Sequence, residues 1–196
     1  MKIEVVEKLN EKLTTFPGIS KKQADKMSNF LLQKDDEYVD DLIKHLLALK
    51  NQLSFCPNCN FIKENGKCLS CDADNKENVL MIVESVAIVK KISEMNFFNG
   101  KYYVLPYLLS IKNQLNDEQL EYKHLFNFLF NNSFNEVIIV LSPTLDGEIT
   151  TNHLMEKMKE LKIPHSRAAI GMPMNSNVDY LDSFTIKQSI NNRNNN

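Results

Sequence analysis

Four cysteines, the only four in the chain, form a single CxxC–x8–CxxC unit: Cys56, Cys59, Cys68 and Cys71. Each CxxC pair can offer two thiolates from a short knuckle. The eight residues between the pairs can turn back, so that all four sulfurs face one tetrahedral ion. The spacing therefore predicts a structural zinc site. We expect a closed site, because four sulfurs leave no coordination position for water or substrate.

A pair of disulfides is the alternative for the same cysteines, and it requires an oxidising compartment. Residues 1–13 lack the long apolar core of a secretory signal. The longest apolar runs, such as Val79–Val83 and Val137–Leu141, are far too short to span a bilayer. We therefore expect zinc rather than disulfides, in a cytoplasmic protein with no membrane partner.

Charge and missing motifs limit the classes of function. The chain has 196 residues, enough for one large or two small domains, and a formal net charge of −2. A nucleic-acid partner would therefore have to bind a local positive patch. No histidine is paired with serine or cysteine in a nucleophile pattern, which argues against a hydrolase triad. The GxxxxGK[ST] signature of one ATPase class is also absent.

The N-terminal part has the apolar periodicity of helices. Residues 3–13 carry apolar side chains at helical spacing, and a third helix is predicted from near Asp36. Between these helices, residues 16–20 break the pattern with Phe-Pro-Gly-Ile-Ser. Ser20 is a suitable N-cap for the second helix.

From Val79 onward, strands alternate with helices. The predicted strands are Val79–Val83, Tyr102–Leu105, Val137–Leu141 and Ser166–Ala169, and the predicted helices are Val86–Met95, Asp117–Phe130 and Glu148–Leu161. This alternation predicts a parallel sheet covered by helices on both faces. The fold class is therefore α/β with a helical N-terminal part. Residues 171–190 show no clear period, and the Asn-rich tail 191–196 is predicted to be disordered.

The turn between the first two helices fits a helix-hairpin-helix. In such a unit a glycine-containing turn, here Gly18, points backbone N–H groups at a phosphate, and the next helix adds its positive dipole end. Lys21, Lys22 and Lys26 would add charge beside those amides. An ordinary pair of antiparallel helices with a solvated lysine face explains the same residues, since Pro-Gly turns are common.

Three acidic residues are expected near the carboxyl ends of neighbouring strands. Glu84 follows the strand 79–83, and Asp146 and Glu148 lie in the loop after the strand that ends at Leu141. Parallel strands bring such ends to one crevice, where three carboxylates could hold Mg²⁺. The alternative is that Glu148 favours the first turn of its helix and Asp146 shapes the loop.

In this order, the parts resemble the bacterial recombination mediator family RecR, over roughly residues 5–190. The α/β part is similar to a Toprim domain, the fold shared with DNA primases and topoisomerases. The resemblance is carried by Phe16-Pro17-Gly18, the cysteine spacing, Val83-Glu84-Ser85, Ser142-Pro143-Thr144 with Gly147-Glu148, Ser166-Arg167-Ala168 and Gly171-Met172-Pro173. The implied domains are a helix-hairpin-helix (1–54), a zinc finger (55–72), a Toprim domain (78–170) and a C-terminal segment with oligomer contacts and the tail (171–196).

The resemblance implies a non-enzymatic DNA clamp of recombinational DNA repair, associated with the nucleoid. Family members form rings, commonly homo-tetramers, able to encircle DNA, and we expect binding to single- and double-stranded DNA without sequence specificity. They act with RecO, and in some bacteria with RecF, to help RecA replace single-strand binding protein at gaps. Lys22 and Lys26 fall on basic positions implicated in DNA contact. Glu84, Asp146 and Glu148 fall on the Toprim acidic positions, which the family uses for partner contacts more than for catalysis.

Two departures from the family pattern bear on function. The family turn usually has glycine at the position of Ser20. Losing glycine restricts φ, so we expect a less well-formed amide hairpin and weaker DNA binding. After the second strand the family has a glycine-rich stretch, of which residues 106–116 keep only Leu109-Ser110. The sequence does not predict what this loop does at the crevice or in the ring.

Two other functions fit the same residues. A Mg²⁺-dependent Toprim nuclease would use Glu84, Asp146 and Glu148 to hold the metal for phosphodiester cleavage. The sequence, however, offers no obvious general base beside these carboxylates. A zinc-stabilised protein-interaction module would bind a partner protein and no DNA.

Overall fold

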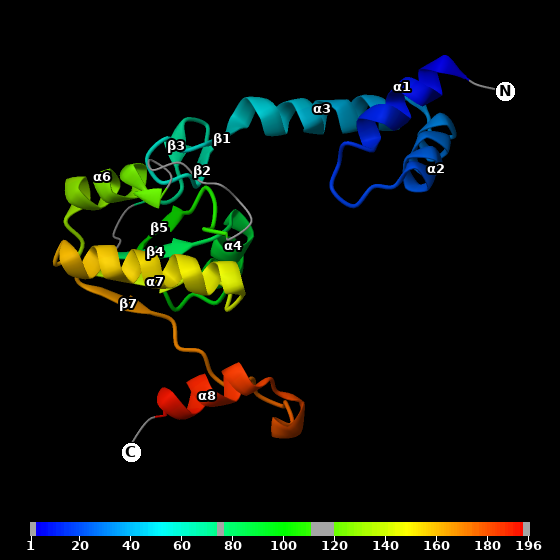
Figure 1. Cartoon of the computed structure of the whole chain (residues 1–196). Coiled ribbons are helices and arrows are strands. Elements are labelled where there is room, and N and C mark those ends of the chain that lie inside the picture. Colours follow the sequence, from blue (N-terminus) through cyan, green and yellow to red (C-terminus); the bar gives the residue numbers. More distant parts are fainter. Residues whose placement is uncertain (1–2, 74–76, 111–119, 194–196) are drawn as a thin grey trace. The chain divides into compact units, whose positions relative to one another are not determined.

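The computed structural model describes residues 3–73, 77–110 and 120–193 (Figure 1). The chain forms two compact units, Met1–Gln52 and Leu53–Asn196. The first unit is helical, and the second contains two β-sheets with helices. Among the helices within the described ranges, none combines the length and the hydropathy that a membrane span requires.

The first unit consists of three helices: α1 (Glu4–Leu13), α2 (Lys21–Leu32) and α3 (Asp36–Gln52). They confirm the three helices predicted from the sequence. α1 and α2 pack against each other, and Ala24 of α2 is fully buried. Across this interface the Asn10 side chain accepts a hydrogen bond from the Ser28 hydroxyl and donates one to Asp25. These polar contacts fix how the two helices of the hairpin lie against each other.

A three-stranded antiparallel sheet opens the second unit. Its strands, in sheet order, are β1 (Leu53–Phe55), β2 (Ile62–Glu64) and β3 (Lys67–Cys68). Asn65 and Gly66 join β2 to β3 with φ of 48° and 85°. This is the left-handed conformation that an Asn-Gly hairpin turn requires. The sequence did not predict this sheet, because strands of two or three residues are too short to show a period.

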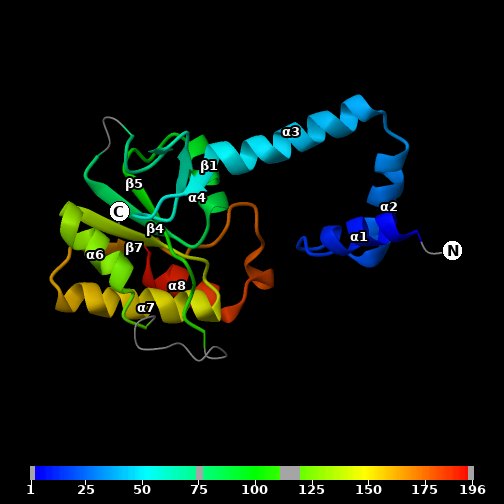
Figure 2. The same ribbon diagram turned by 90° about the horizontal axis from the view of Figure 1, so that it is seen from above.

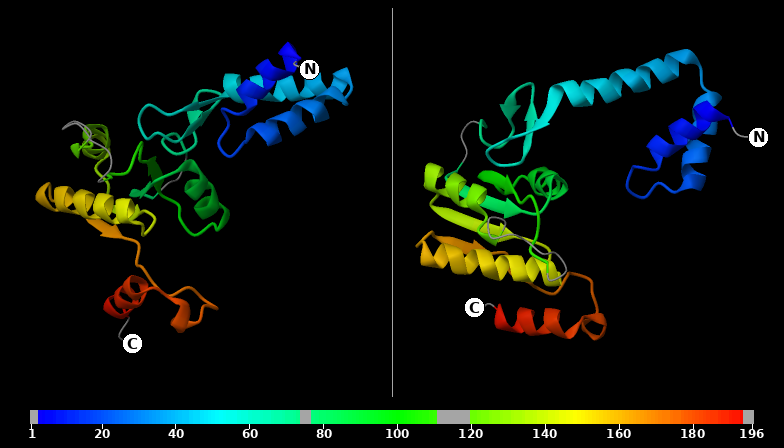
Figure 3. Two further views of the ribbon diagram at one scale, coloured as in Figure 1. Left: turned by 45° about the vertical axis from the view of Figure 1, so that its right-hand side comes forward. Right: turned by 45° about the horizontal axis from the view of Figure 1, so that its top comes forward.

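The larger sheet has four parallel strands in the order β5-β4-β6-β7, which confirms the predicted α/β class. The strands are β4 (Val79–Val83), β5 (Lys101–Val104), β6 (Glu136–Val140) and β7 (His165–Arg167). The helices between them are α4 (Val86–Glu94), α6 (Lys123–Asn132) and α7 (Leu145–Glu160). Right-handed crossovers put α4 on one face of the sheet and α6 and α7 on the other (Figures 2 and 3).

The two central strands supply the middle of the core. Leu80, Ile82 and Val83 of β4 and Val137 and Ile139 of β6 are almost completely buried. The helices add Val89, Leu125, Leu154 and Met158. Because helices cover both faces, a central strand can be apolar at every position. Each such side chain contributes about 1.5–3 kcal/mol when it is removed from water.

One helix starts earlier than the sequence predicted. α7 begins at Leu145 and not at Glu148. The Thr144 hydroxyl caps it by accepting the N–H of Gly147. Asp146 therefore lies in the first helical turn, and its prediction as a loop residue is wrong.

The remaining differences between the predicted and the observed elements lie before β6 and after β7. The helix predicted at Asp117–Phe130 begins at Lys123, and residues 117–119 lie outside the described ranges. The segment 171–190, which showed no period, forms two short elements: the 3-10 helix η1 (Val178–Tyr180) and α8 (Ser183–Asn191). Asp182 caps α8 by accepting the N–H of Thr185. The tail 191–196 was predicted to be disordered, but Asn191 ends α8, and residues 194–196 lie outside the described ranges.

Gly147 is the point where the first turn of α7 lies against the loop after β6. A Cβ at this position would be 1.9 Å from the backbone oxygen of Ser142. We expect Gly147→Ala to lower the free energy of unfolding by about 2 kcal/mol or more, because helix and loop have to move apart. Urea denaturation followed by circular dichroism measures this change.

Gly171→Ala is the matched control. Its added Cβ would meet nothing within 4 Å. Its free energy of unfolding should change by less than ~0.5 kcal/mol. Equal losses in the two variants would contradict the importance of the contact at Gly147.

Candidate functional site

The four cysteines come together beside the small sheet. Cys56 and Cys59 precede β2, Cys68 ends β3, and Cys71 follows it. Their sulfur atoms all lie within 4.8 Å of one another. No other group of three or more Cys, His, Asp or Glu side chains gathers in this way in the described part of the chain. The predicted convergence of the cysteines is confirmed, and their donor set fits a tetrahedral metal ion.

Backbone N–H groups and burial set the chemistry of these thiols. The N–H groups of Ser70 and Cys71 donate to Cys68 Sγ at 3.4 and 3.3 Å. Burial raises the pKa of Cys68, and a hydrogen bond with Cys71 together with burial raises the pKa of Cys59 well above its usual value. Protons on these two thiols must leave when a cation binds. A metal therefore competes with protons for the site.

The cysteine knuckles also cover an open edge of the parallel sheet, since β5 is an edge strand. The N–H of Val104 donates to the carbonyl of Cys59 at 2.9 Å, and the Val104 carbonyl accepts from Asn60 Nδ2 at 3.0 Å. Two residues earlier, the Ser70 hydroxyl donates to the Tyr102 carbonyl at 3.1 Å and accepts the Tyr102 N–H at 2.7 Å. The backbone groups on the outer side of β5 are therefore paired with the knuckles and closed to another strand.

His124 of α6 forms a further link between the knuckles and the sheet. Its Nδ1 lies 2.6 Å from the Tyr103 hydroxyl oxygen, and its Nε2 lies 2.6 Å from the carbonyl oxygen of Pro57. A neutral ring protonated on Nε2 satisfies both, since the hydroxyl then donates to Nδ1. Sequence reasoning missed Ser70, Asn60 and His124. Their partners are 32, 44 and 67 residues away, so no local signal marks them.

The turn between α1 and α2 presents backbone amides beside lysines. Gly18 has φ of 79°, a left-handed conformation that suits glycine. The Ser20 hydroxyl accepts the N–H of Gln23, and Gln23 Oε1 accepts the N–H of Ser20. The N–H groups of Lys21 and Lys22 have no acceptor in the described part of the chain. These two amides are available to a ligand oxygen.

Serine is unstrained at position 20. Ser20 has φ of −79° and ψ of 162°, extended backbone that any residue adopts. Serine therefore adds no backbone strain to this turn, and a less well-formed amide hairpin than with glycine stays a prediction. Its capping box with Gln23 instead engages two amides internally, which leaves fewer of them for a ligand. Whether DNA binding is weaker as a result stays a prediction.

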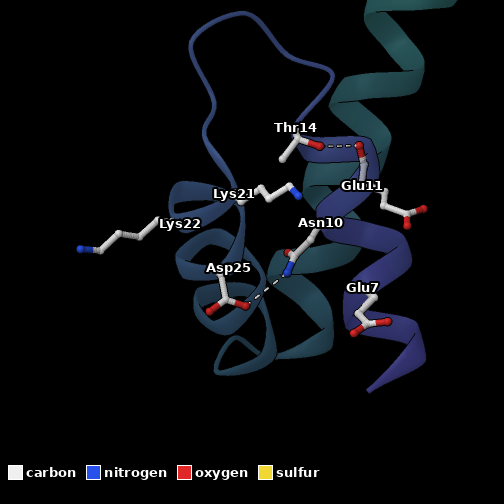
Figure 4. A pocket seen from close by; sticks show the side chains of 7 residues that line it. All are labelled: Glu7, Asn10, Glu11, Thr14, Lys21, Lys22 and Asp25. Atoms are coloured by element: carbon white, nitrogen blue, oxygen red, sulfur yellow. Dashed lines mark hydrogen bonds between the residues drawn. The ribbon is translucent and has the colours of Figure 1, made fainter. Parts of the chain in front are cut away.

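The three predicted lysines of α2 are exposed. In Figure 4 Lys21 extends toward α1 near Glu11, whereas Lys22 points away from the hairpin. The groove between α1 and α2 is lined by Glu7, Asn10, Glu11, Thr14, Lys21, Lys22 and Asp25. The charge of Lys21 is therefore offset by α1 more than that of Lys22. Lys26 lies one turn further along α2.

Glu84 and Glu148 each have a partner of their own, and Asp146 lies at the start of a helix. Glu84 accepts hydrogen bonds from the Ser142 hydroxyl and, at 3.1 Å, from the Ser142 N–H. Glu148 accepts two from the Arg167 guanidinium, at 2.6 and 3.1 Å. Asp146 lies in the first turn of α7, where its charge complements the helix dipole. In the described ranges the three carboxylates form no cluster that could ligate a cation, so the predicted convergence on Mg²⁺ is not seen.

The first part of the divergent loop is held against α6 and α7. The Tyr122 hydroxyl donates to the Tyr107 carbonyl at 3.1 Å, and the two rings stack with centroids 5.1 Å apart. The N–H of Leu109 donates to the Thr150 hydroxyl at 2.8 Å, and its side chain is buried. The retained Leu109 therefore anchors the loop to α7. Residues 111–116 lie outside the described ranges.

Comparison with known proteins identifies relatives along almost the whole chain. The family model of the Toprim domain matches residues 78–169, and that of "RecR, C-terminal" matches residues 171–194. Recombination protein RecR of Mycoplasmopsis pulmonis is 32% identical, over 98% of this chain and 100% of its own. The proteins of the same name from Ureaplasma urealyticum and Finegoldia magna are 34% and 30% identical, each over 95% of this chain and 94% of their own.

Ser70→Ala tests the cover over β5. Ser70 is 1% exposed, so the variant leaves both backbone groups of Tyr102 without a partner in a buried place. We expect the free energy of unfolding to fall by about 2 kcal/mol. We also expect faster hydrogen exchange at the Tyr102 amide, measured by NMR.

Ser93→Ala is the control for this experiment. The exposed Ser93 hydroxyl donates only to the carbonyl of Lys90 in its own helix. The control should lose less than ~0.5 kcal/mol. Unchanged exchange at Tyr102 in the Ser70 variant would show that the hydroxyl does not protect the strand edge.

Proposed function

The chain belongs to the RecR family of recombination proteins, and from this premise we propose that it is a DNA clamp that mediates recombination without catalysing a reaction. The observation that carries the proposal is the match to a recombination protein RecR over 98% of this chain and 100% of the relative. We propose that it acts in recombinational DNA repair with RecO, and with RecF where that protein is present. Its task would be to help RecA replace single-strand binding protein at gaps.

The α1–α2 hairpin is the proposed DNA-binding helix-hairpin-helix. The amides of Lys21 and Lys22 and the N-terminal dipole of α2 suit a phosphate oxygen, and Gly18 shapes the turn before them. The side chains of Lys22 and Lys26 add a local positive charge to a chain whose net charge is −2. Phosphate contacts do not read bases, so the proposed binding includes single- and double-stranded DNA of any sequence.

Zinc is the proposed metal of the cysteine cluster. Four sulfur donors without a further ligand are the set that structural zinc sites use. When bound, the ion would hold the four thiolates together and supply folding free energy on the order of 10 kcal/mol. Cys59 and Ser70 would pass this stabilisation on to β5 through their hydrogen bonds.

A ring of copies, commonly four, is the proposed assembly. Two regions expose apolar side chains that a second copy could cover. On α3 these are Leu42, Ile43, Leu46, Leu47 and Leu49, and in the C-terminal segment they are Met172, Met174, Val178, Tyr180, Phe184 and Ile190. Apolar patches of this kind mark protein–protein interfaces. In a ring several hairpins would act on one DNA molecule, which multiplies contacts that are individually weak.

Partner binding, and not catalysis, is the proposed role of the Toprim acidic residues. Glu148 is neutralised by Arg167, and Glu84 is bonded to Ser142. A nuclease would need both carboxylates free to hold Mg²⁺. Their existing bonds support a non-enzymatic function, in which Glu84, Asp146 and Glu148 contact other proteins.

Lys22→Ala/Lys26→Ala tests the DNA-binding hairpin. We expect the affinity for a fluorescent oligonucleotide to fall at least about tenfold, and the slope of log affinity against log salt to become shallower by about one per lost phosphate contact. Fluorescence anisotropy over a range of salt concentrations measures both. Lys44→Ala, an exposed lysine of α3, is the control and should leave the slope nearly unchanged. An unaltered slope in the double variant would reject the hairpin as the DNA interface.

A cleavage assay tests the absence of nuclease activity. Supercoiled and single-stranded DNA incubated with the protein and Mg²⁺ or Mn²⁺ should give no more product than with Glu84→Gln. The reason is that the acidic side chains are engaged within the protein. Cleavage that grows with protein concentration and is lost in Glu84→Gln would establish a Toprim nuclease and refute the clamp without catalysis.

A further inference from the structure

Cys71 is more accessible than the other three clustered cysteines. Cys56, Cys59 and Cys68 are at most 3% exposed, whereas Cys71 is only half-buried. Cys71 also lines a cavity of about 290 Å³ whose walls are largely carboxamide side chains and Lys101. A water molecule occupies about 30 Å³, so a small polar molecule has ample room beside this cysteine.

Hydrogen bonding also separates Cys71 from its neighbours. Two backbone N–H groups donate to Cys68 Sγ, at 3.4 and 3.3 Å. In the described ranges no backbone N–H donates to Cys71 Sγ. Donors around a metal-binding sulfur withdraw electron density from it. The two N–H donors therefore lower the nucleophilic character of Cys68.

Positive charge lies beside the same thiol. Lys101 is the first residue of β5 and lines the same cavity. Reactive cysteines in proteins occupy partly exposed, electropositive surroundings of this kind.

We propose that Cys71 is a modification site, the thiolate of the metal centre that small peroxides reach first. The Cys71 sulfur attacks one oxygen of hydrogen peroxide. The O–O bond breaks, the sulfur loses two electrons, and hydroxide leaves, which gives a sulfenic acid. A second thiolate of the cluster, within 4.8 Å, then attacks that sulfur and displaces a second hydroxide to form a disulfide.

Oxidation at this position would be transmitted to the parallel sheet. Ser70, the residue before Cys71, bonds both backbone groups of Tyr102. A Cys71 withdrawn from the metal centre no longer fixes the knuckle that positions the Ser70 hydroxyl. The outer edge of β5 would then lose part of its cover, until a thiol reductant restores the cysteine.

The test uses the full-length protein, and its zinc content is measured first because the inference rests on the proposed metal centre. Zinc-loaded protein is treated with a limiting amount of hydrogen peroxide in the presence of dimedone, which traps sulfenic acids. Peptide mass spectrometry then quantifies the label at each cysteine. We expect Cys71 to carry at least about five times the label of any other cysteine. A chromophoric chelator should detect zinc released at the same rate.

The outcomes separate the two proposals. Protein purified without zinc, and unable to take it up, would refute the zinc centre itself. Zinc-loaded protein whose four cysteines are labelled equally would leave the zinc centre standing and overturn the role of Cys71. First labelling at a buried cysteine such as Cys56 would overturn it as well.

Matched lysine variants test the electrostatic part. Lys101→Gln keeps the length of the side chain and removes its charge, so we expect labelling of Cys71 to slow by about threefold. Lys91→Gln is the control, at an exposed lysine in the last turn of α4. In this variant Cys71 should be labelled at the same rate as in the unmodified protein. Equal rates in the two variants would overturn the contribution of Lys101.

Discussion

The hydrogen bonds between the cysteine knuckles and β5 are the interaction on which the second unit depends. An edge strand has one row of backbone groups without a partner, and such rows invite pairing with other chains. Here the row is satisfied by Cys59, Asn60 and Ser70. All three residues belong to the knuckles that also bring the four sulfurs together. The cysteine module and the parallel sheet are therefore joined by these hydrogen bonds, in agreement with their place in a single compact unit.

The sequence predicted best the features that arise from a local physical cause. The strand 79–83 was placed to the residue, because a strand buried on both faces is apolar at every position. The cysteine cluster followed from its spacing, and Ser20 from its capping chemistry. The start of α7 was missed for an equally local reason. Gly147 is a poor helix former, so its presence argued against a helix there, although the first turn of α7 begins right after the N-cap Thr144.

Features created by tertiary contacts could not be predicted from the sequence. The hydroxyl of Ser70 forms hydrogen bonds with the backbone of Tyr102 because β5 lies beside it. Nothing in the local sequence Cys-Leu-Ser-Cys predicts that β5 is its neighbour. The acidic residues are a similar case. The sequence predicted that they follow strand ends. The pairing of Glu148, however, depends on which positively charged side chain of β7 lies opposite it. That side chain belongs to Arg167, which forms an ion pair with Glu148 of α7. A charged residue inside the predicted strand Ser166–Ala169 is the signal that could have suggested the pair.

The contacts around the carboxyl ends of the strands fit the proposed role, in which a Toprim fold serves a protein that mediates recombination without catalysing a reaction. Gly147 has no Cβ, so the first turn of α7 can lie directly against Ser142. Ser142 in turn holds Glu84 through its N–H and its hydroxyl. One turn into α7, Glu148 is held by Arg167 in a bidentate pair whose side chains are only 19% and 28% exposed. A cation would have to break both arrangements, and separating a partly buried, hydrogen-bonded ion pair costs more than separating one at the surface. The carboxylates that could ligate a metal instead join β4 to β6 and α7 to β7, which fixes the side chains at this end of the sheet.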